Sequence, residues 1–170
     1  MSIPARNANP SNIVRSDRTF FITTQTCRKK RLLQSDRNAT LLIDVLRSCV
    51  RAHRFQLHDF GVMPDHVHLL LTVADGVTIE KAMQFIKGGF SFRLKRETSY
   101  TGEVWQHGFT DRRVRDVESF EDHQRYIAAN PVTAGLATSQ EEFPRCFTTL
   151  ARAKSLSPRS TQLRSHAGGT

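Results

Sequence analysis

The sequence is poor in cysteine and has no long apolar run, and each shortage excludes a class of protein. Cys27, Cys49 and Cys146 are the only cysteines in 170 residues, and no two of them form a Cys-x-x-Cys pair. An odd, scattered set predicts neither a disulfide framework nor a thiolate zinc site, and it fits a reducing compartment. No apolar stretch approaches the roughly 18 residues of a membrane span, and residues 1–11 lack the apolar core of a signal peptide. We therefore expect a cytoplasmic protein that does not associate with membranes.

Acidic residues are also scarce, because 16 Asp and Glu stand against 25 Lys and Arg, a formal net charge of +9. This excess favours a polyanionic partner, nucleic acid above all. A membrane surface is disfavoured because no helix combines the basic residues with an extended exposed apolar face. We predict that DNA is contacted by eight basic residues, Arg28, Lys29, Lys30, Arg31, Lys87, Arg93, Arg112 and Arg115.

The length of the chain predicts one folded domain large enough to bury a core. Residues 1–17 are polar and contain two prolines, so we interpret them as a basic N-terminal arm. Residues 18–149 hold the patterned segments and form the predicted domain. Residues 150–170 are rich in Ser, Arg, Gly and Thr and are predicted to be a disordered basic tail.

Hydrophobic periodicity predicts the order strand, helix, strand, strand, helix, strand, helix. The strands are expected at 19–26, 55–62 and 66–73 and within 104–114, and the helices at 36–53, from 79 past 90, and at 118–130. This order is that of a ferredoxin-like α+β sandwich, an antiparallel sheet with helices packed on one face. The order alone does not define a function.

Helix-breaking residues lie within one predicted helix and directly after another. Gly88 and Gly89 each cost about 1 kcal/mol against Ala in a helix, so they mark either a close approach of another backbone or a break in the helix. Pro131 is expected to stop the third helix at Asn130, because the residue before a proline resists the α conformation.

Two histidines stand one residue apart where an apolar strand begins. His66 and His68 share one face of that strand, because successive side chains alternate between faces. Neighbouring imidazoles on a stiff support form a ready pair of metal ligands, and a divalent cation would relieve the cost of burying them. The plainer alternative is that this pair is an ordinary strand end at the surface.

The third predicted helix contains Tyr126, one of only two tyrosines, and Asn130 lies one turn further on the same face. If that face meets His66 and His68, the phenol stands beside a bound metal and the Asn130 carbonyl supplies a third, oxygen ligand. Tyrosine can act as a nucleophile. An ordinary phenol, with a pKa near 10, is ionised in only about one molecule in a thousand at pH 7, so attack on a phosphate would need a nearby cation. Otherwise, Tyr126 is a rim residue of a face packed through Phe120 and Ile127.

Several motifs then occur in a characteristic order. They are Val62-Met63-Pro64-Asp65-His66-Val67-His68-Leu69-Leu70-Leu71, Met83-Gln84-x-x-Lys87-Gly88, Trp105-Gln106-x-Gly108-Phe109, Val114-Arg115-Asp116 and Tyr126-Ile127-x-x-Asn130-Pro131-Val132-x-Ala134-Gly135-Leu136. Over residues 18–147 the chain resembles the IS200-like transposases, in particular the REP-associated tyrosine transposases, which are single-tyrosine HUH nucleases. The resemblance implies a ferredoxin-like fold, Mg or Mn held by His66 and His68, and Asn130 as a further ligand. It also implies that Tyr126 cuts single-stranded DNA and keeps the 5′ phosphate.

Three segments depart from the family pattern. They are Thr110-Asp111-Arg112, Thr133, and Cys146-Phe147-Thr148-Thr149. None of them touches the implied chemistry, so the departures bear on which DNA sequence is preferred and on how the C-terminal segment packs.

The sequence therefore predicts a metal-dependent endonuclease and strand transferase that acts on single-stranded or hairpin DNA through a covalent 5′-phosphotyrosine intermediate. One alternative is a nucleic-acid-binding module of the same fold that does no chemistry. Another is a metallonuclease that uses water, for which Tyr126 would be dispensable. Monomer and homodimer both remain open.

Overall fold

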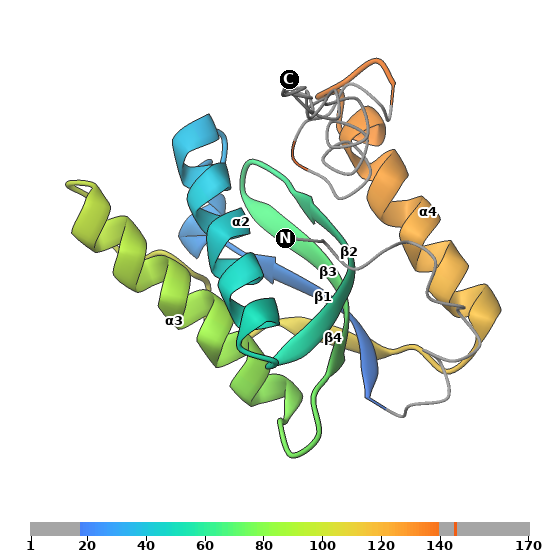
Figure 1. Cartoon of the computed structure of the whole chain (residues 1–170). Coiled ribbons are helices and arrows are strands. Elements are labelled where there is room, and N and C mark those ends of the chain that lie inside the picture. The colour runs from blue at the N-terminus through green and yellow to red at the C-terminus, as the bar shows by residue number, and fades with distance from the viewer. Residues whose placement is uncertain (1–17, 140–144, 146–170) are drawn as a thin grey trace, which may run out of the picture.

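The computed structural model describes residues 18–139 and residue 145. It is an α+β sandwich, as predicted (Figure 1). Its elements are β1 Thr19–Gln25, the 3-10 turn η1 Cys27–Lys29, α2 Asp36–Arg51, β2 Phe55–Val62, β3 His66–Val73, α3 Ile79–Glu97, β4 Thr110–Arg113 and α4 Val117–Thr133. The predicted N-terminal arm and basic tail lie outside the described residues. No helix in the described part of the chain is both long and apolar enough to cross a membrane.

The four strands form one antiparallel sheet in the order β2-β3-β1-β4. This is the ferredoxin-like arrangement, in which the β2-β3 hairpin places β3 between β1 and β2. The hairpin closes through a bond from the Met63 N–H to the His66 carbonyl, 2.9 Å long. Both hairpin strands have the bounds that the sequence predicts.

The fourth strand occupies only the last part of the segment that was predicted to contain it. Residues 104–114 were expected to hold it, but β4 covers only Thr110–Arg113, and Trp105 makes an isolated bridge to Thr26. Gly108, with φ of +75°, turns the chain between the bridge and the strand, a conformation that glycine adopts without steric cost.

The two faces of the sheet carry separate cores. Alternate residues such as Ile22 and Leu69 pack with α2 and α3 in the main core. On the opposite face, Leu70 and the half-buried Phe21 pack with Phe120 and Ile127 of α4. The prediction that all helices share one face is therefore wrong for α4, which lies across the sheet from α2 and α3 (Figure 1). The physical reason is that Phe120 and Ile127, two turns apart on α4, bury themselves against this second apolar patch.

Helix α3 runs without a break through Gly88 and Gly89. A Cβ added to Gly89 would lie 3.1 Å from Cγ1 of Val45 on α2, whereas one added to Gly88 would meet nothing within 4 Å. Of the two alternatives, close approach thus holds for Gly89, although the neighbour is a side chain and not a backbone.

Helix α4 continues beyond the predicted stop. Pro131 lies inside it and is buried, and the helix ends at Thr133. Proline removes one backbone donor. The chain nevertheless stays helical for two further residues, because the Ala134 N–H reaches the Asn130 carbonyl at 2.9 Å and the Leu136 N–H reaches the Pro131 carbonyl at 2.8 Å. Gly135 then leaves the helix with φ of +70°.

Candidate active site

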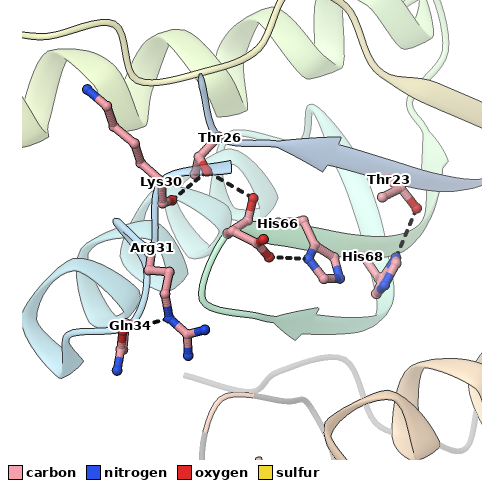
Figure 2. A network of polar contacts seen from close by, with 8 residues as sticks. Thr23, Thr26, Lys30, Arg31, Gln34, His66 and His68 are labelled. Atoms are coloured by element: carbon pink, nitrogen blue, oxygen red, sulfur yellow. Dashed lines mark hydrogen bonds and ion pairs between the residues drawn. The ribbon is translucent and has the colours of Figure 1, made fainter. Parts of the chain in front are cut away.

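His68 is the most enclosed polar ring on the α4 side of the sheet. Only 4% of the residue is exposed. Its Nδ1 lies 2.9 Å from the Thr23 hydroxyl on the neighbouring strand (Figure 2). Its Nε2 is buried and has no hydrogen-bond partner within the described residues. Because leaving a buried polar atom unpaired costs about 1–3 kcal/mol, this nitrogen fits a position that receives a metal ion.

The electrostatics of His68 agree with that fit. Burial, with a smaller contribution from neighbouring His66, lowers the pKa of His68 from 6.5 to about 3, so the ring is neutral at pH 7. A proton on Nδ1 would be donated to the Thr23 oxygen, which leaves the lone pair of Nε2 free. Neutral imidazole is the form that binds metal.

His66 stands beside His68 with the two ring centroids 4.8 Å apart. Its Nδ1 lies 2.6 Å from Oδ1 of Asp65, and the two rings lie on the same side of β3 (Figure 2). A carboxylate that accepts the Nδ1 proton fixes the orientation of the ring and leaves Nε2 as the donor atom for a metal. Sequence reasoning did not assign this role to Asp65, although its place directly before His66 was visible.

Tyr126 projects from α4 towards this pair. Its ring centroid lies 5.2 Å from that of His68, edge to face, and 51% of the residue is exposed. The face of α4 therefore does meet the histidine face, which is the condition that the sequence left open. An exposed phenol beside a buried imidazole can be reached by a large substrate such as a DNA strand.

Asn130, one turn further along α4, is half-buried. Its side chain makes no hydrogen bond with the described residues, so its carbonyl oxygen is available. Within those residues no group of three or more His, Cys, Asp or Glu is placed to hold a metal. A third ligand beyond His66 and His68 must then come from a donor of another kind, such as the predicted Asn130 amide or a phosphate oxygen.

Two residues that sequence reasoning missed hold α4 in place. Gly61 pairs with His68 across the hairpin, and a Cβ there would lie 3.3 Å from Cγ2 of Ile127. Phe21 on β1 touches both sides of the site, with its ring centroid 5.6 Å from His68 and 5.8 Å from Tyr126. Neither residue has a local signal, because both act through partners that are distant in the sequence.

The basic turn at residues 28–31 is tied to the histidine end of the hairpin. The buried Thr26 hydroxyl lies 2.6 Å from the Lys30 carbonyl and 3.0 Å from the Asp65 carbonyl (Figure 2). Arg28 and Lys29 on this turn are exposed. Arg112 pairs with Phe21 in the sheet, so it points to the histidine face as well.

Lys87 and Arg93 lie elsewhere. The Lys87 ammonium donates to the carbonyls of Gln106 and Gly108 at 2.9 and 2.6 Å, and burial lowers its pKa. Arg93 pairs with Glu97 at 2.8 Å on α3, across the sheet from the histidines. The structure therefore does not bring Arg93 to the site, and it uses Lys87 to hold a loop. Arg115 is exposed in the connection between β4 and α4.

Fold and site together define a class: an antiparallel ferredoxin-like protein with a paired-histidine strand faced by a tyrosine helix. The family described as "Transposase IS200 like" matches residues 17–130. The chain belongs to this family and is a transposase of it.

Within this family, two curated relatives carry the name REP-associated tyrosine transposase. The REP-associated tyrosine transposase of Escherichia coli K12 is 24% identical over 139 residues, 78% of this chain and 76% of its own length. A Haemophilus influenzae protein provisionally given the same name is 24% identical over 132 residues, 66% of this chain and 74% of its own. Among solved structures, a REP-associated tyrosine transposase bound to a REP hairpin has a TM-score of 0.69 at 23% identity, covering 84% of this chain and 83% of the other. At that identity the structural match shows the shared fold.

Proposed function

We propose that the protein is a metal-dependent endonuclease and strand transferase that acts on single-stranded or hairpin DNA through a covalent 5′-phosphotyrosine. One observation carries this proposal: the exposed Tyr126 ring lies 5.2 Å from His68, whose buried Nε2 has no partner in the described part of the chain. The solved relative bound to a REP hairpin supports hairpin DNA as the substrate.

The reaction exchanges one phosphodiester for another. The Tyr126 oxygen attacks phosphorus and loses its proton, so a tyrosine O–P bond forms while the bond from phosphorus to the 3′ oxygen breaks. The leaving 3′ oxygen keeps the electron pair and takes up a proton to become a free hydroxyl. Attack by a 3′ hydroxyl on the phosphotyrosine reverses these steps, and rejoining needs no ATP because the bond energy is retained.

His66 and His68, with the Asn130 carbonyl as a further oxygen donor, would hold Mg or Mn. An ion held there would offset the phosphate charge that repels a phenolate and would polarise phosphorus towards attack. Asp65 and Thr23 fix the orientation of the two imidazoles through hydrogen bonds at their Nδ1 atoms. Phe21 stacks on His68 and shields that ring from water on one side.

The direct test is incubation with a hairpin oligonucleotide labelled at its 3′ end, together with Mg or Mn, followed by a denaturing protein gel. We expect a labelled adduct that survives denaturation and a second fragment that ends in a 3′ hydroxyl. Cleavage without an adduct would favour the water-using nuclease. Tight binding without cleavage would favour the binding module.

DNA affinity should depend steeply on salt. The net charge of +9 and the exposed turn at residues 28–31 predict that several phosphates are neutralised on binding. Each such contact to a single strand should lower log affinity by about 0.7 per unit of log salt concentration. Titration by fluorescence anisotropy at several salt concentrations measures the slope, and Arg28→Ala with Lys29→Ala should reduce it by about 1.4. A flat response would contradict nucleic-acid binding through these residues.

Gly61→Ala should slow adduct formation without unfolding the protein. The new methyl group would lie 3.3 Å from Ile127 Cγ2, so Ile127 must move by a few tenths of an ångström, and we expect α4 to move with it and displace Tyr126. Since a misplacement of 1 Å can cost about a hundredfold in rate, we expect a loss of roughly tenfold.

Gly88→Ala is the matched control for that variant, because its methyl group meets nothing within 4 Å. Single-turnover adduct rates and thermal unfolding of both variants make the comparison. Equal adduct rates for the two variants would show that the contact between Gly61 and α4 does not set the position of the tyrosine.

A further inference from the structure

A polar recess of about 260 Å³ lies beside the histidine pair, across β1. It is lined by Thr23, Gln25, Gln106, His107, Gly108, Phe109 and Thr110. None of these residues carries a carboxylate, so an anionic strand meets no fixed negative charge on the lining. Pockets for drug-sized molecules usually measure roughly 300–1,000 Å³, so this recess suits one smaller planar group.

The sheet register places the recess on the catalytic face. Thr23 pairs with His68 on one side and with Thr110 on the other, and Gln25 pairs with His66. Residues opposite each other in a sheet point to the same face, and neighbouring strands lie about 4.7–4.9 Å apart. The recess therefore begins one strand away from the imidazoles, and Thr23 belongs to both.

The outer wall of the recess is held in place by bonds that involve other residues. The Lys87 ammonium binds the Gln106 and Gly108 carbonyls, and the Gln106 N–H reaches the Gln25 carbonyl at 2.9 Å. The Trp105 indole N–H donates to the Lys87 carbonyl at 3.0 Å, which fixes the helix end of this clamp. Residues 106–108 thus form an anchored wall.

Three polar side chains of the recess lining are available to bind a ligand. In the part of the chain that the structure describes, the amides of Gln25 and Gln106 and the ring of His107 have no hydrogen-bond partner. An amide both donates and accepts, and it can form a bidentate pair with N6 and N7 of adenine. Single-stranded nucleic acid is read in this way, by splayed bases that stack on rings and bond through their edges. Contacts to the phosphates do not distinguish one base from another.

We propose that Gln25, Gln106 and His107 form a pocket that reads one nucleobase, adenine in preference, adjacent to the phosphate that Tyr126 attacks. Adenine is the base proposed because it is the usual bidentate partner of a glutamine amide. The position of this base next to the attacked phosphate follows from the separation of one β-strand between the recess and His68. This inference rests on the proposed function for the identity of the attacked phosphate, whereas base selection itself can be measured by binding alone.

The test is a selection from hairpin oligonucleotides whose single-stranded flank is randomised, with the bound DNA sequenced. For the unmodified protein we expect adenine to be enriched at one flanking position. In Gln25→Ala and Gln106→Ala that enrichment should fall by about five- to a hundredfold, the discrimination that one good bidentate pair provides. Gln56→Ala, at an exposed position of β2 outside the recess, is the matched control and should keep the enrichment.

The same DNA pools are scored separately for covalent adduct. If no adduct forms while both glutamine variants flatten the selection, the proposed chemistry fails and the pocket stands. If adduct forms but the two variants select the same bases as the unmodified protein, the pocket is refuted and the chemistry stands. Enrichment of a different base that both variants lose would retain the recess and overturn adenine. Thermal unfolding of each variant checks that the fold is intact.

Discussion

The Tyr126→Phe protein is expected to form no covalent adduct with DNA. The substitution removes only the attacking oxygen and leaves the ring that contacts His68 and Phe21, so the site should keep its shape. Loss of a nucleophile commonly lowers a reaction by about 10⁴-fold or more. Labelled hairpin DNA and a denaturing gel measure the adduct, and anisotropy should show binding close to that of the unmodified protein.

Tyr100→Phe is the control for this experiment. The Tyr100 hydroxyl donates to the Glu103 carbonyl at 2.9 Å within its own turn, so it is not presented to a substrate. Adduct formation by this variant should be normal. Strand cleavage by Tyr126→Phe at the normal rate would refute the covalent mechanism and favour attack by water. Loss of the adduct in both variants would point to a general defect.

His68→Ala is expected to remove cleavage and Mn binding together. The substitution deletes Nε2 of His68, a buried nitrogen that has no hydrogen-bond partner in the described residues, and with it one of the two ligands that we assign to the ion. His66→Ala should act in the same direction. We expect a loss of at least about a hundredfold in rate, because the developing charge is then no longer offset. Calorimetric titration of Mn measures binding apart from activity, and chelation of the unmodified protein should reproduce the loss until metal is restored.

His58→Gln is the control for the histidine variants. His58 is also half-buried on this sheet, with its Nε2 2.7 Å from the Thr72 hydroxyl, and glutamine can keep that bond. Burial lowers the pKa of His58 from 6.5 to about 4, so its neutral form stabilises the fold above pH 6.5, and this contribution is lost as pH falls towards 4. Because His58 bonds to Thr72 and is not one of the assigned metal ligands, the variant should bind Mn normally at pH 7. Cleavage that survives in both His66→Ala and His68→Ala would eliminate the metal site.

Local pattern was sufficient for much of the fold. The bounds of β2 and β3 follow from two runs of eight strand-forming residues on either side of a short turn, and the alternation of side chains along a strand puts His66 and His68 on one face. Ser35 caps α2 by accepting from the Asn38 N–H, three residues further along the chain. Such features depend on residues within one or two turns of each other, so the sequence alone determines them.

That the histidine pair on β3 and Tyr126 on α4 lie together could be seen only in the tertiary structure. Thr23 and His68 are 45 positions apart in the sequence, and they hydrogen-bond across neighbouring strands. Gly61 lies on a different strand, and its lack of a side chain leaves space for Ile127 of α4. The face on which α4 packs, and with it the approach of Tyr126 to His68, depends on apolar patches contributed by three elements at once. A sequence shows which residues can bind a metal or attack a phosphate. Only the paired strands and the packed helix decide that they meet, because those contacts are cooperative and long-range.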